Sequence, residues 1–283
     1  MIWTEEKIRR MEAEGRGRGS GAGYRPWLEV ASVSSIGRSR RVSSPKTGRT
    51  HHLLSDVEHD LFLACEWAQN VVDIREQYPL PREVTQTIAQ KLRIRHPFYP
   101  GTHVPTVMTV DFLLTVLVGG EKKFLALNAK RDEEANDVRS LEKLEIQRTA
   151  LEEMEVSHYL IYDSQIPQQK LRNIEWIRGA LMKEGETEPY VGFFKGLASR
   201  MTEELATAAD PVLAATVEEY CTAFDVRHGV QTGTGLRVVR MLMAERSLMP
   251  DLTSPDLTRE SLASFIVTGR PGRLRAVGGE DAF

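Results

Sequence analysis

The residue types best suited to chemistry in this sequence are two acids and a lysine. Glu58 and Asp111 carry carboxylates, and the tripeptide Asn128-Ala129-Lys130 ends in an amine. Carboxylates can hold one or two Mg²⁺ ions, which activate a water molecule and stabilise a leaving oxygen, while a nearby lysine offsets phosphate charge or positions the water. The residue types therefore predict metal-dependent hydrolysis of a phosphodiester.

Each candidate also has a simpler structural explanation. Glu58 is the third residue after Ser55, and Ser-x-x-Glu is the pattern of a helix capping box. Asp111 could be an ordinary residue on a half-exposed strand face, and Lys130 could simply end a strand. The pair His51-His52 would suit zinc, but no second pair of ligands follows at the usual spacing. From the residues alone, both interpretations stay open.

Two strands joined by a tight turn would bring the acid and the lysine together. Val107–Val118 alternates, with apolar residues at every even-numbered position from 108 to 118 and Asp111 on the opposite face. A Gly-Gly pair follows, as in two-residue hairpin turns. The second strand, 124–130, places Asn128 and Lys130 on one face. Glu58 would arrive from a preceding helix, predicted from Ser55 to about residue 67.

The remaining pattern predicts an α/β core with a mixed sheet, because helices and strands alternate along residues 1–165. Further helices are expected at 4–14, 84–92 and 133–155, strands at 24–33, 71–77 and 156–163, and a hairpin with a basic tip at 40–53. The buried stripe of the helix at 133–155 is expected to consist of Val138, Leu141, Leu144, Leu151 and Met154.

A change of pattern near residues 164–167 predicts a domain boundary. After it the apolar spacing is helical, with helices expected at 171–181, at 190–206, from Asp210 onward and at 235–246. The predicted domains are therefore residues 1–165, an α/β core, and residues 166–283, a compact helical domain of ordinary size.

The bulk composition is that of a globular protein, with 41% hydrophobic and 27% charged residues. No stretch is apolar enough to predict a membrane span, and the N-terminus has no apolar core of a signal peptide. Only two cysteines are present, without a Cys-x-x-Cys pattern, so a disulfide framework is not expected and a reducing cytoplasm fits best. The glycine-rich run at 15–23 lacks the flanking strand and helix of a phosphate-binding loop.

Positive charge is concentrated near the N-terminus. Residues 1–50 hold eleven Lys or Arg against five Asp or Glu, although the whole chain carries a net charge of −3. Such a basic arm suits a DNA phosphate backbone, and the alternative is a solvated leader. The candidate DNA contacts are Arg16, Arg18, Arg25, Arg38, Arg40, Arg41, Lys46 and Arg49.

Several segments resemble the TnsA family of transposon endonuclease subunits, in the order and spacing of that family. The segments that include candidate residues are HHLLSDVE at 51–58 and MTVDF at 108–112; VDIREQYPL at 72–80 and LEKLE at 141–145 also agree. EGRG at 14–17, YRPW at 24–27 and NIEW at 173–176 are similar to the same family. The resemblance covers about residues 8–180 and thins in the last third of the chain.

The resemblance implies a restriction-endonuclease-like catalytic domain followed by a winged-helix-like domain. It implies that Glu58, Asp111 and Lys130 are catalytic and that Glu58, Asp111, Asn128 and the carbonyl of Ala129 lie near Mg²⁺, for which Mn²⁺ would substitute. The expected reaction is cleavage of double-stranded DNA at the 5′ ends of a transposon. The expected partners are a TnsB-type transposase, which cuts and joins the 3′ ends, and a TnsC-type AAA+ ATPase regulator bound through the C-terminal part.

Two positions depart from the family pattern. Asn128 stands where an acid or Gln is usual, and Gln147 stands where an acid is expected; either change would weaken a second metal site. Two other functions are considered: a stand-alone restriction or repair nuclease, which would cut DNA by itself, and a catalytically inactive scaffold between transposase and regulator. The intact acids and lysine argue against the scaffold.

Overall fold

A four-stranded mixed sheet organises the first of two compact units into which the chain divides. The units are Met1–Pro167 and Gln168–Phe283, so the division falls two residues after the predicted one. The computed structural model describes residues 3–32, 38–183, 185–208 and 210–267. Each unit has a core of its own, built from the buried apolar residues of its helices and strands.

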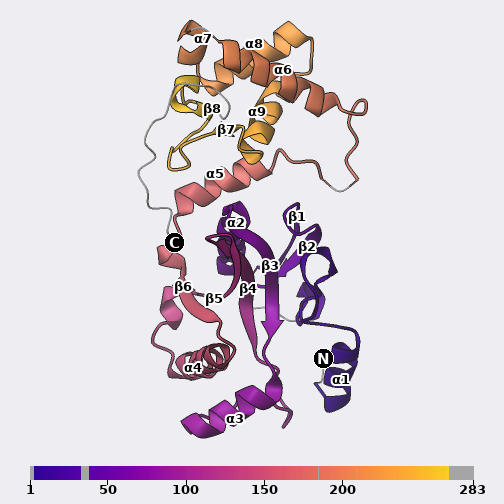
Figure 1. Ribbon diagram of the computed structural model, residues 1–283, viewed down its shortest axis with the longest axis vertical. Coiled ribbons are helices and arrows are strands. Elements are labelled where there is room, and N and C mark those ends of the chain that lie inside the picture. Colours follow the sequence, from indigo (N-terminus) through magenta and orange to yellow (C-terminus); the bar gives the residue numbers. More distant parts are fainter. Residues whose placement is uncertain (1–2, 33–37, 184, 209, 268–283) are drawn as a thin grey trace. The chain divides into compact units, whose positions relative to one another are not determined.

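The sheet of the first unit has the order β3-β4-β5-β6. Strands β3 (Val71–Pro79), β4 (Thr109–Val118) and β5 (Glu121–Lys130) are antiparallel neighbours, and β6 (Ser157–Tyr162) runs parallel to β5 (Figure 1). The parallel pair requires a crossover, which helix α4 (Val138–Glu153) supplies. The predicted α/β class with a mixed sheet is therefore confirmed.

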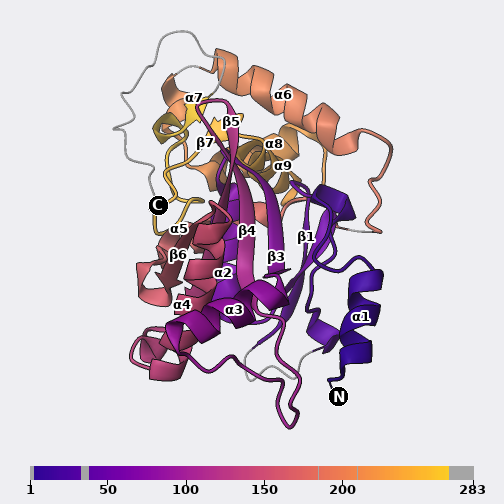
Figure 2. The same cartoon turned by 60° about the horizontal axis from the view of Figure 1, so that its bottom comes forward.

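Three helices flank this sheet. Helices α3 (Arg82–Leu92) and α4 pack together with sheet residues in one apolar cluster, whereas α2 (Asp56–Trp67) lies behind the sheet in the view of Figure 2. The cluster includes Ile88 from α3, Leu113 and Ala126 from the sheet, and Ile146 from α4, all at most 3% exposed. Burial on both sides fixes the sheet, and hence the residues at its end.

The N-terminal part confirms two predicted elements and corrects a third. Helix α1 (Glu5–Ala13) and the hairpin of β1 (Arg40–Ser44) and β2 (Arg49–Leu53) lie where the sequence predicts. The strand expected at 24–33 is wrong: its described residues are irregular, with a short 3₁₀ turn at Val30–Ser32. Its amides bond elsewhere, since Trp27 N–H donates to the Gln77 carbonyl.

Helix α4 is shorter and differently oriented than predicted. It begins at Val138, after Asp137, whose carboxylate accepts hydrogen bonds from the Arg139 and Ser140 amides as an N-cap. Its buried residues are Ile146, Gln147, Ala150 and Leu151, whereas three of the predicted stripe are exposed: Val138, Leu141 and Met154. The helix thus buries a polar residue, Gln147, toward the sheet.

The second unit is helical, with one small two-stranded sheet. Its helices are α5 (Gln168–Arg178), α6 (Phe193–Thr207), α7 (Asp210–Ala214), α8 (Val217–His228) and α9 (Thr234–Ala244), and β7 (Leu248–Met249) pairs with β8 (Ile266–Val267). The helix predicted from Asp210 breaks, because Thr216 and Glu219 form a capping box that starts α8. Across the described residues of both units, no helix is long and apolar enough to cross a membrane.

Candidate active site

Strands β4 and β5 separate at the candidate residues. Their ladder ends at the pair Phe112 and Leu127, and beyond it the Asp111 carboxylate accepts a hydrogen bond from the Ala129 amide at 2.8 Å. Strand β5 meanwhile stays paired with β6 as far as Lys130. The half-buried Asp111 carboxylate therefore lies where the two strands part, and the strand alternation puts Asn128 and Lys130 on its face of the sheet.

Glu58 reaches this place from the first turn of α2. Ser55 caps the helix by accepting from the Glu58 amide at 3.1 Å, and the Glu58 carboxylate accepts from the Leu54 amide at 2.9 Å. The capping explanation thus holds for the backbone, yet the side chain is only 7% exposed, which is unusual for a capping acid. Burial, and next the charge of Asp111, raise the pKa of Glu58 to about 8.

The charges of Asp111 and Lys130 also affect each other's pKa. Burial raises the pKa of Asp111, although the Ala129 amide and the charge of Lys130 oppose the shift. Burial would lower the pKa of Lys130, but the charges of Asp111 and Glu134 outweigh it and leave that pKa raised. Lys130 Nζ lies 3.1 Å from a carboxylate oxygen of Glu134. The structure therefore brings Glu58, Asp111 and Lys130 within electrostatic reach of one another, and adds Glu134.

The two positions that depart from the family pattern are both buried amides. Asn128 Oδ1 lies 2.8 Å from His158 Nε2 on β6, and burial lowers the pKa of that histidine. Gln147 donates from Nε2 to the Thr109 carbonyl at 2.8 Å, two residues before Asp111. Within the described residues its Oε1 is buried without a hydrogen-bond partner. Both side chains offer neutral oxygens where a carboxylate would add charge.

Sequence reasoning missed Gln77, which lies between the two acids. Its Nε2 donates to Glu58 at 3.4 Å and its Oε1 accepts from the Thr109 hydroxyl at 3.0 Å, and its amide lowers the pKa of Asp111. Gln77 lies in the segment VDIREQYPL that resembles the family, but nothing in that segment marks it as a site residue, because a glutamine inside a strand pattern is unremarkable until the register between β3 and β4 is known.

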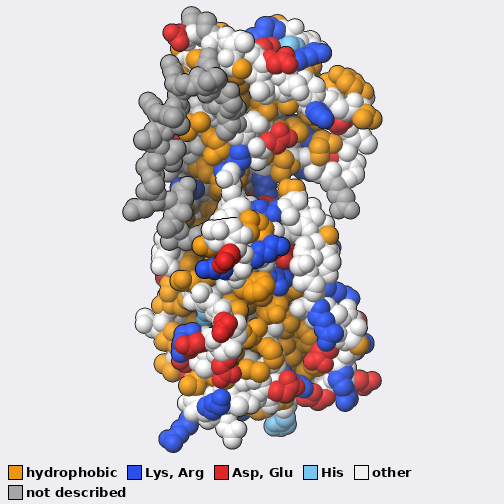
Figure 3. Space-filling view, viewed as in Figure 1, with side chains coloured by type: hydrophobic (Ala, Val, Ile, Leu, Met, Phe, Trp, Pro, Cys, Tyr) orange, Lys and Arg blue, Asp and Glu red, His pale blue; other side chains and the backbone are white. Residues whose placement is uncertain are grey.

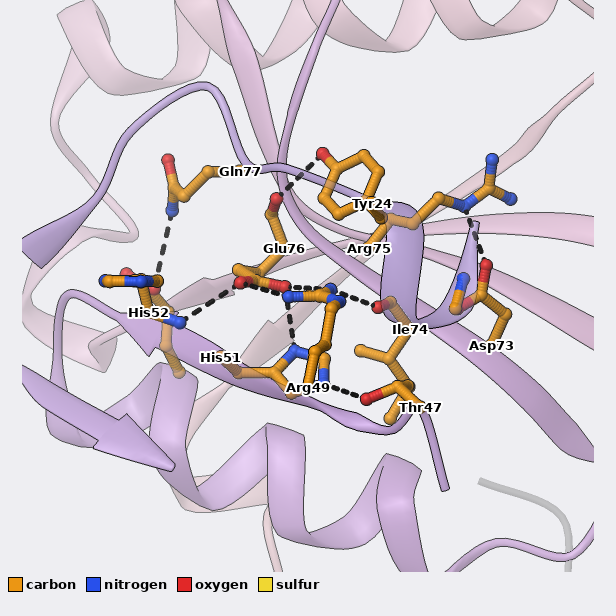
Figure 4. A network of polar contacts seen from close by, with 12 residues as sticks. Tyr24, Thr47, Arg49, His51, His52, Asp73, Ile74, Arg75, Glu76 and Gln77 are labelled. Atoms are coloured by element: carbon orange, nitrogen blue, oxygen red, sulfur yellow. Dashed lines mark hydrogen bonds and ion pairs between the residues drawn. The ribbon is translucent and has the colours of Figure 1, made fainter. Parts of the chain in front are cut away.

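A buried ionic network lies beside Gln77 and accounts for Arg49 and the histidine pair (Figure 4). Arg49 donates to both carboxylate oxygens of Glu76, at 2.8 and 2.5 Å, and His51 Nδ1 lies 2.7 Å from the same carboxylate. His52 Nδ1 accepts from the Val30 amide. Arg49 is therefore part of the interior, and the expectation that it contacts DNA is corrected: a guanidinium paired in this way cannot also hold a phosphate.

The other basic residues do not form one continuous arm. Lys46 Nζ donates to the Ala68 and Val71 carbonyls, Arg16 and Arg25 are paired with Glu29, and Arg40 with Asp56. Four of the predicted contacts are exposed, namely Arg18, Arg25, Arg38 and Arg41, and of these Arg25 is the one in the ion pairs above. On the face in Figure 3, Lys and Arg side chains near α1 are interspersed with Asp and Glu. Arg18, Arg38 and Arg41 therefore remain the predicted DNA contacts whose side chains are exposed and in none of these ion pairs.

The donor set at the candidate site suits a hard divalent cation. Glu58 and Asp111 supply carboxylate oxygens. Burial raises the pKa of both carboxyl groups, and the charge of Asp111 raises that of Glu58 further. A cation bound between the two carboxylates would offset both the burial of their charge and their repulsion. Among the described residues, no group of three or more His, Cys, Asp or Glu side chains is arranged to hold a metal. The protein therefore provides two carboxylates, with backbone and amide oxygens to complete any ligand set.

Comparison with known proteins identifies the family of the chain. Residues 68–163 match the family described as "TnsA-like endonuclease N terminal", and residues 165–252 match "TnsA endonuclease C terminal". The chain is also 36% identical over 242 residues to "Transposon Tn7 transposition protein TnsA" of Escherichia coli, an alignment that covers 86% of this chain and 84% of that protein. The two family matches together cover parts of both units, and the alignment with this relative spans 86% of the chain, so the chain belongs to the TnsA endonuclease family.

Proposed function

We propose that this protein is the Mg²⁺-dependent endonuclease subunit of a heteromeric transposase and that it hydrolyses the 5′ ends of its transposon. The observation that carries the proposal is that Glu58, Asp111 and Lys130 lie within electrostatic reach of one another where β4 and β5 separate. Membership of an endonuclease family and the similarity to a Tn7 transposition protein support it.

The chemistry divides between the bound ion and the side chains. When bound, the Mg²⁺ would lower the pKa of a water molecule and stabilise the departing oxygen. Glu58 and Asp111 would hold it, with oxygens from Asn128 and Ala129 nearby, and Mn²⁺ would substitute. Lys130 keeps its positive charge at neutral pH, since its pKa is raised, and can offset the charge of the scissile phosphate or orient the attacking water.

The second unit is proposed to serve protein contacts. Helices α8 and α9 and the β7–β8 pair follow one another as in a winged-helix-like domain. The arginines of α9 are engaged within that unit, because Arg237 pairs with Glu186 and Arg240 donates to the Trp176 carbonyl. With those charges used internally, binding of a TnsC-type AAA+ regulator is favoured over reading of DNA. A TnsB-type transposase would cut and join the 3′ ends.

The first test removes the central acid. Asp111→Asn keeps the shape of the side chain but takes away its charge, so cleavage of the 5′ strands should fall by at least a thousandfold while the protein stays folded. Strand cleavage on labelled transposon ends and far-UV circular dichroism measure the two outcomes. Unchanged 5′ nicking by a folded Asp111→Asn protein would sink the assignment.

The second test addresses the division of labour with the transposase. Lys130→Ala assembled with both partner proteins should leave the 5′ strands attached to the donor, so that 3′ joining yields branched products instead of simple insertions. Gel analysis of the joined DNA distinguishes them. Clean simple insertions would show that another subunit cuts these strands. Cleavage by the unaltered protein alone would favour the stand-alone nuclease.

A further inference from the structure

Gln77 donates a hydrogen bond to Glu58 and lies opposite Asp111 in the sheet, and none of the roles above accounts for it. We propose that Gln77 is a positioning residue, which sets the spacing and orientation of Glu58 and Asp111 so that together they bind a divalent cation. The inference rests on the proposed function, because it concerns the same metal site.

The first support is its place in the sheet. Glu76 pairs with Phe112 and Tyr78 pairs with Val110, which places Gln77 opposite Asp111 across the β3–β4 ladder. From there its amide makes two hydrogen bonds: Nε2 donates to Glu58 at 3.4 Å, and Oε1 accepts from the Thr109 hydroxyl at 3.0 Å. The same amide lowers the pKa of Asp111, although burial outweighs this effect. The side chain is 3% exposed, so water does not compete for these contacts.

The second support is the backbone. Gln77 has φ +47°, in the left-handed region that costs energy for any residue with a Cβ atom. The other described non-glycine residues with positive φ, Arg93, Glu155 and Arg246, each lie just beyond the end of a helix, where this conformation is common. Gln77 alone among these four lies inside a strand. Glycine would relieve the strain, so the side chain that is present there must contribute something in return.

The third support is the rigidity of its surroundings. The Gln77 carbonyl accepts from the Trp27 amide at 3.2 Å, and the Tyr24 hydroxyl donates to the Glu76 carbonyl at 3.0 Å (Figure 4). The Glu76 side chain is locked by Arg49 and His51. Adjacent residues therefore hold the strand in its strained conformation, and the amide direction is fixed before any ligand arrives.

An amide suits this task better than the alternatives of similar size. It can donate to an ionised Glu58 while accepting from Thr109, so it orients the carboxylate without adding charge. A glutamate would add a third negative charge beside two carboxylates that already repel each other. Residues that orient metal ligands in this way commonly change metal affinity 10- to 100-fold when they are replaced.

The test measures metal binding by the full-length protein without DNA. Gln77→Gly removes the side chain and relieves the backbone; Gln77→Asn keeps an amide that tolerates positive φ but is one methylene too short to reach Glu58. Both should weaken Ca²⁺ and Mn²⁺ binding in calorimetric titrations by about tenfold or more, with thermal midpoints within a few degrees of the unaltered protein. Arg93→Gly is the matched control, because it relieves a positive φ at the C-terminal cap of α3, which contributes none of the proposed metal ligands, and it should leave binding unchanged.

A second readout separates positioning from general damage. If Gln77 acts through the metal ligands, the Gln77→Asn protein should need more Mn²⁺ for half-maximal 5′ cleavage but approach the unaltered rate at saturation. A rate that stays low at saturating Mn²⁺, or Ca²⁺ affinity equal to that of the unaltered protein, would overturn the inference.

Asp111→Asn distinguishes this failure from failure of the proposed function. If Asp111→Asn abolishes Ca²⁺ binding while both Gln77 variants bind normally, the metal site stands and only the role of Gln77 is wrong. If Asp111→Asn also binds Ca²⁺ normally, or if the unaltered protein binds none, the metal site itself is wrong and the inference falls with it.

Discussion

At the scale of single residues, the protonation of Glu58 should control metal binding. Its pKa of about 8 means that it is largely protonated at pH 7, and a cation must displace that proton. Ca²⁺ affinity measured without DNA should therefore rise with pH by up to about tenfold per unit until about pH 8 and then level off. Titrations at pH 6.5, 7.5 and 8.5 measure the slope. A flat profile would contradict the assignment, and Glu58→Gln should remove both the slope and most of the affinity.

The raised pKa of Glu58 makes the metal-free protein less stable as the pH rises, whereas metal binding becomes stronger. Because the folded-state pKa of Glu58 lies above the ordinary value of 4.5, its contribution to stability is fully present below that value. The contribution is lost as the pH rises toward about 8. Saturating Ca²⁺ should cancel the loss, since the bound form of Glu58 is ionised.

Glu76 has the opposite effect on the pH dependence of stability, because its pKa is lowered in the folded protein. Burial alone would raise its pKa, but hydrogen bonds from Arg49 and His51 outweigh burial and hold the pKa at about 2. Its stabilising contribution is therefore present above about pH 4.5 and lost as the pH falls toward 2. Glu76→Gln leaves the Arg49 guanidinium buried without a counter-ion and should lower the free energy of unfolding by about 3 kcal/mol at pH 7.

Urea denaturation at pH 7 and pH 3 measures this effect. The difference between Glu76→Gln and the unaltered protein should shrink at pH 3, where the unaltered protein has lost part of its own contribution. Glu145→Gln, which removes an ion pair on the exposed face of α4, is the control and should barely move the midpoint. An equally small effect at Glu76 would mean that the network adds nothing to stability.

The residues also show how far sequence reasoning can reach. Glu58, Asp111 and Lys130 can be proposed from residue type, from the hairpin that the Gly-Gly pair predicts and from resemblance. Gln77, Glu134 and His158 cannot, because their relevance depends on strand register and on backbone angles that no local pattern encodes. Arg49 was misjudged for a related reason: a charge in a hairpin looks exposed until a buried Glu76 is found opposite it.

At the scale of elements, the difference between predicted and observed α4 has a physical cause. Spacing alone favoured a buried stripe of Val138, Leu141, Leu144, Leu151 and Met154, of which only Leu151 is fully buried. The helix is a crossover that packs on α3 and the sheet through Ile146, Ala150 and Leu151. Val138 and Leu141 in its first turn, and Met154 at its C-terminal cap, lie outside that cluster and remain exposed. Strand β4 could be predicted, because its apolar residues alternate with a period of two and a Gly-Gly pair typical of a hairpin turn follows it.

The exposed arginines Arg18, Arg38 and Arg41 lead to a prediction about DNA binding. If Arg18, Arg38 and Arg41 contact phosphates, replacing all three with Ala should weaken binding to every DNA sequence alike. It should also flatten the log–log salt dependence by up to about 2.7, or about 0.9 for each contact. Binding to transposon-end and random duplexes across a salt series measures both.

The matched control for that triple variant is Arg25→Ala. Arg25 belongs to the same segment but is paired with Glu29 and Glu14, so its removal should change the slope little. An unchanged slope in the triple variant, or a loss restricted to transposon ends, would show that these arginines do not clamp the DNA backbone.

At the scale of the whole molecule, the division into two units with separate cores predicts that metal binding and C-terminal stability are independent. All candidate ligands lie in Met1–Pro167, whereas Phe224 is fully buried in the core of Gln168–Phe283. Phe224→Ala should destabilise the second unit by about 3–5 kcal/mol through the cavity that it creates. It should nevertheless leave Ca²⁺ affinity unchanged.

Calorimetric melting resolves this prediction, since a ligand raises the melting temperature only of the cooperative unit that binds it. The Phe224→Ala protein should show two melting transitions. The one at lower temperature, from the second unit, should not shift when Ca²⁺ is added. The one at higher temperature, from the first unit, should shift upward as the Ca²⁺ concentration rises. The Asp111→Asn protein should show no Ca²⁺ shift in either transition. If Phe224→Ala instead lowers Ca²⁺ affinity tenfold, the two units fold as one energetic body, and the C-terminal unit would have to be counted as part of the nuclease rather than as a separate platform for partner proteins.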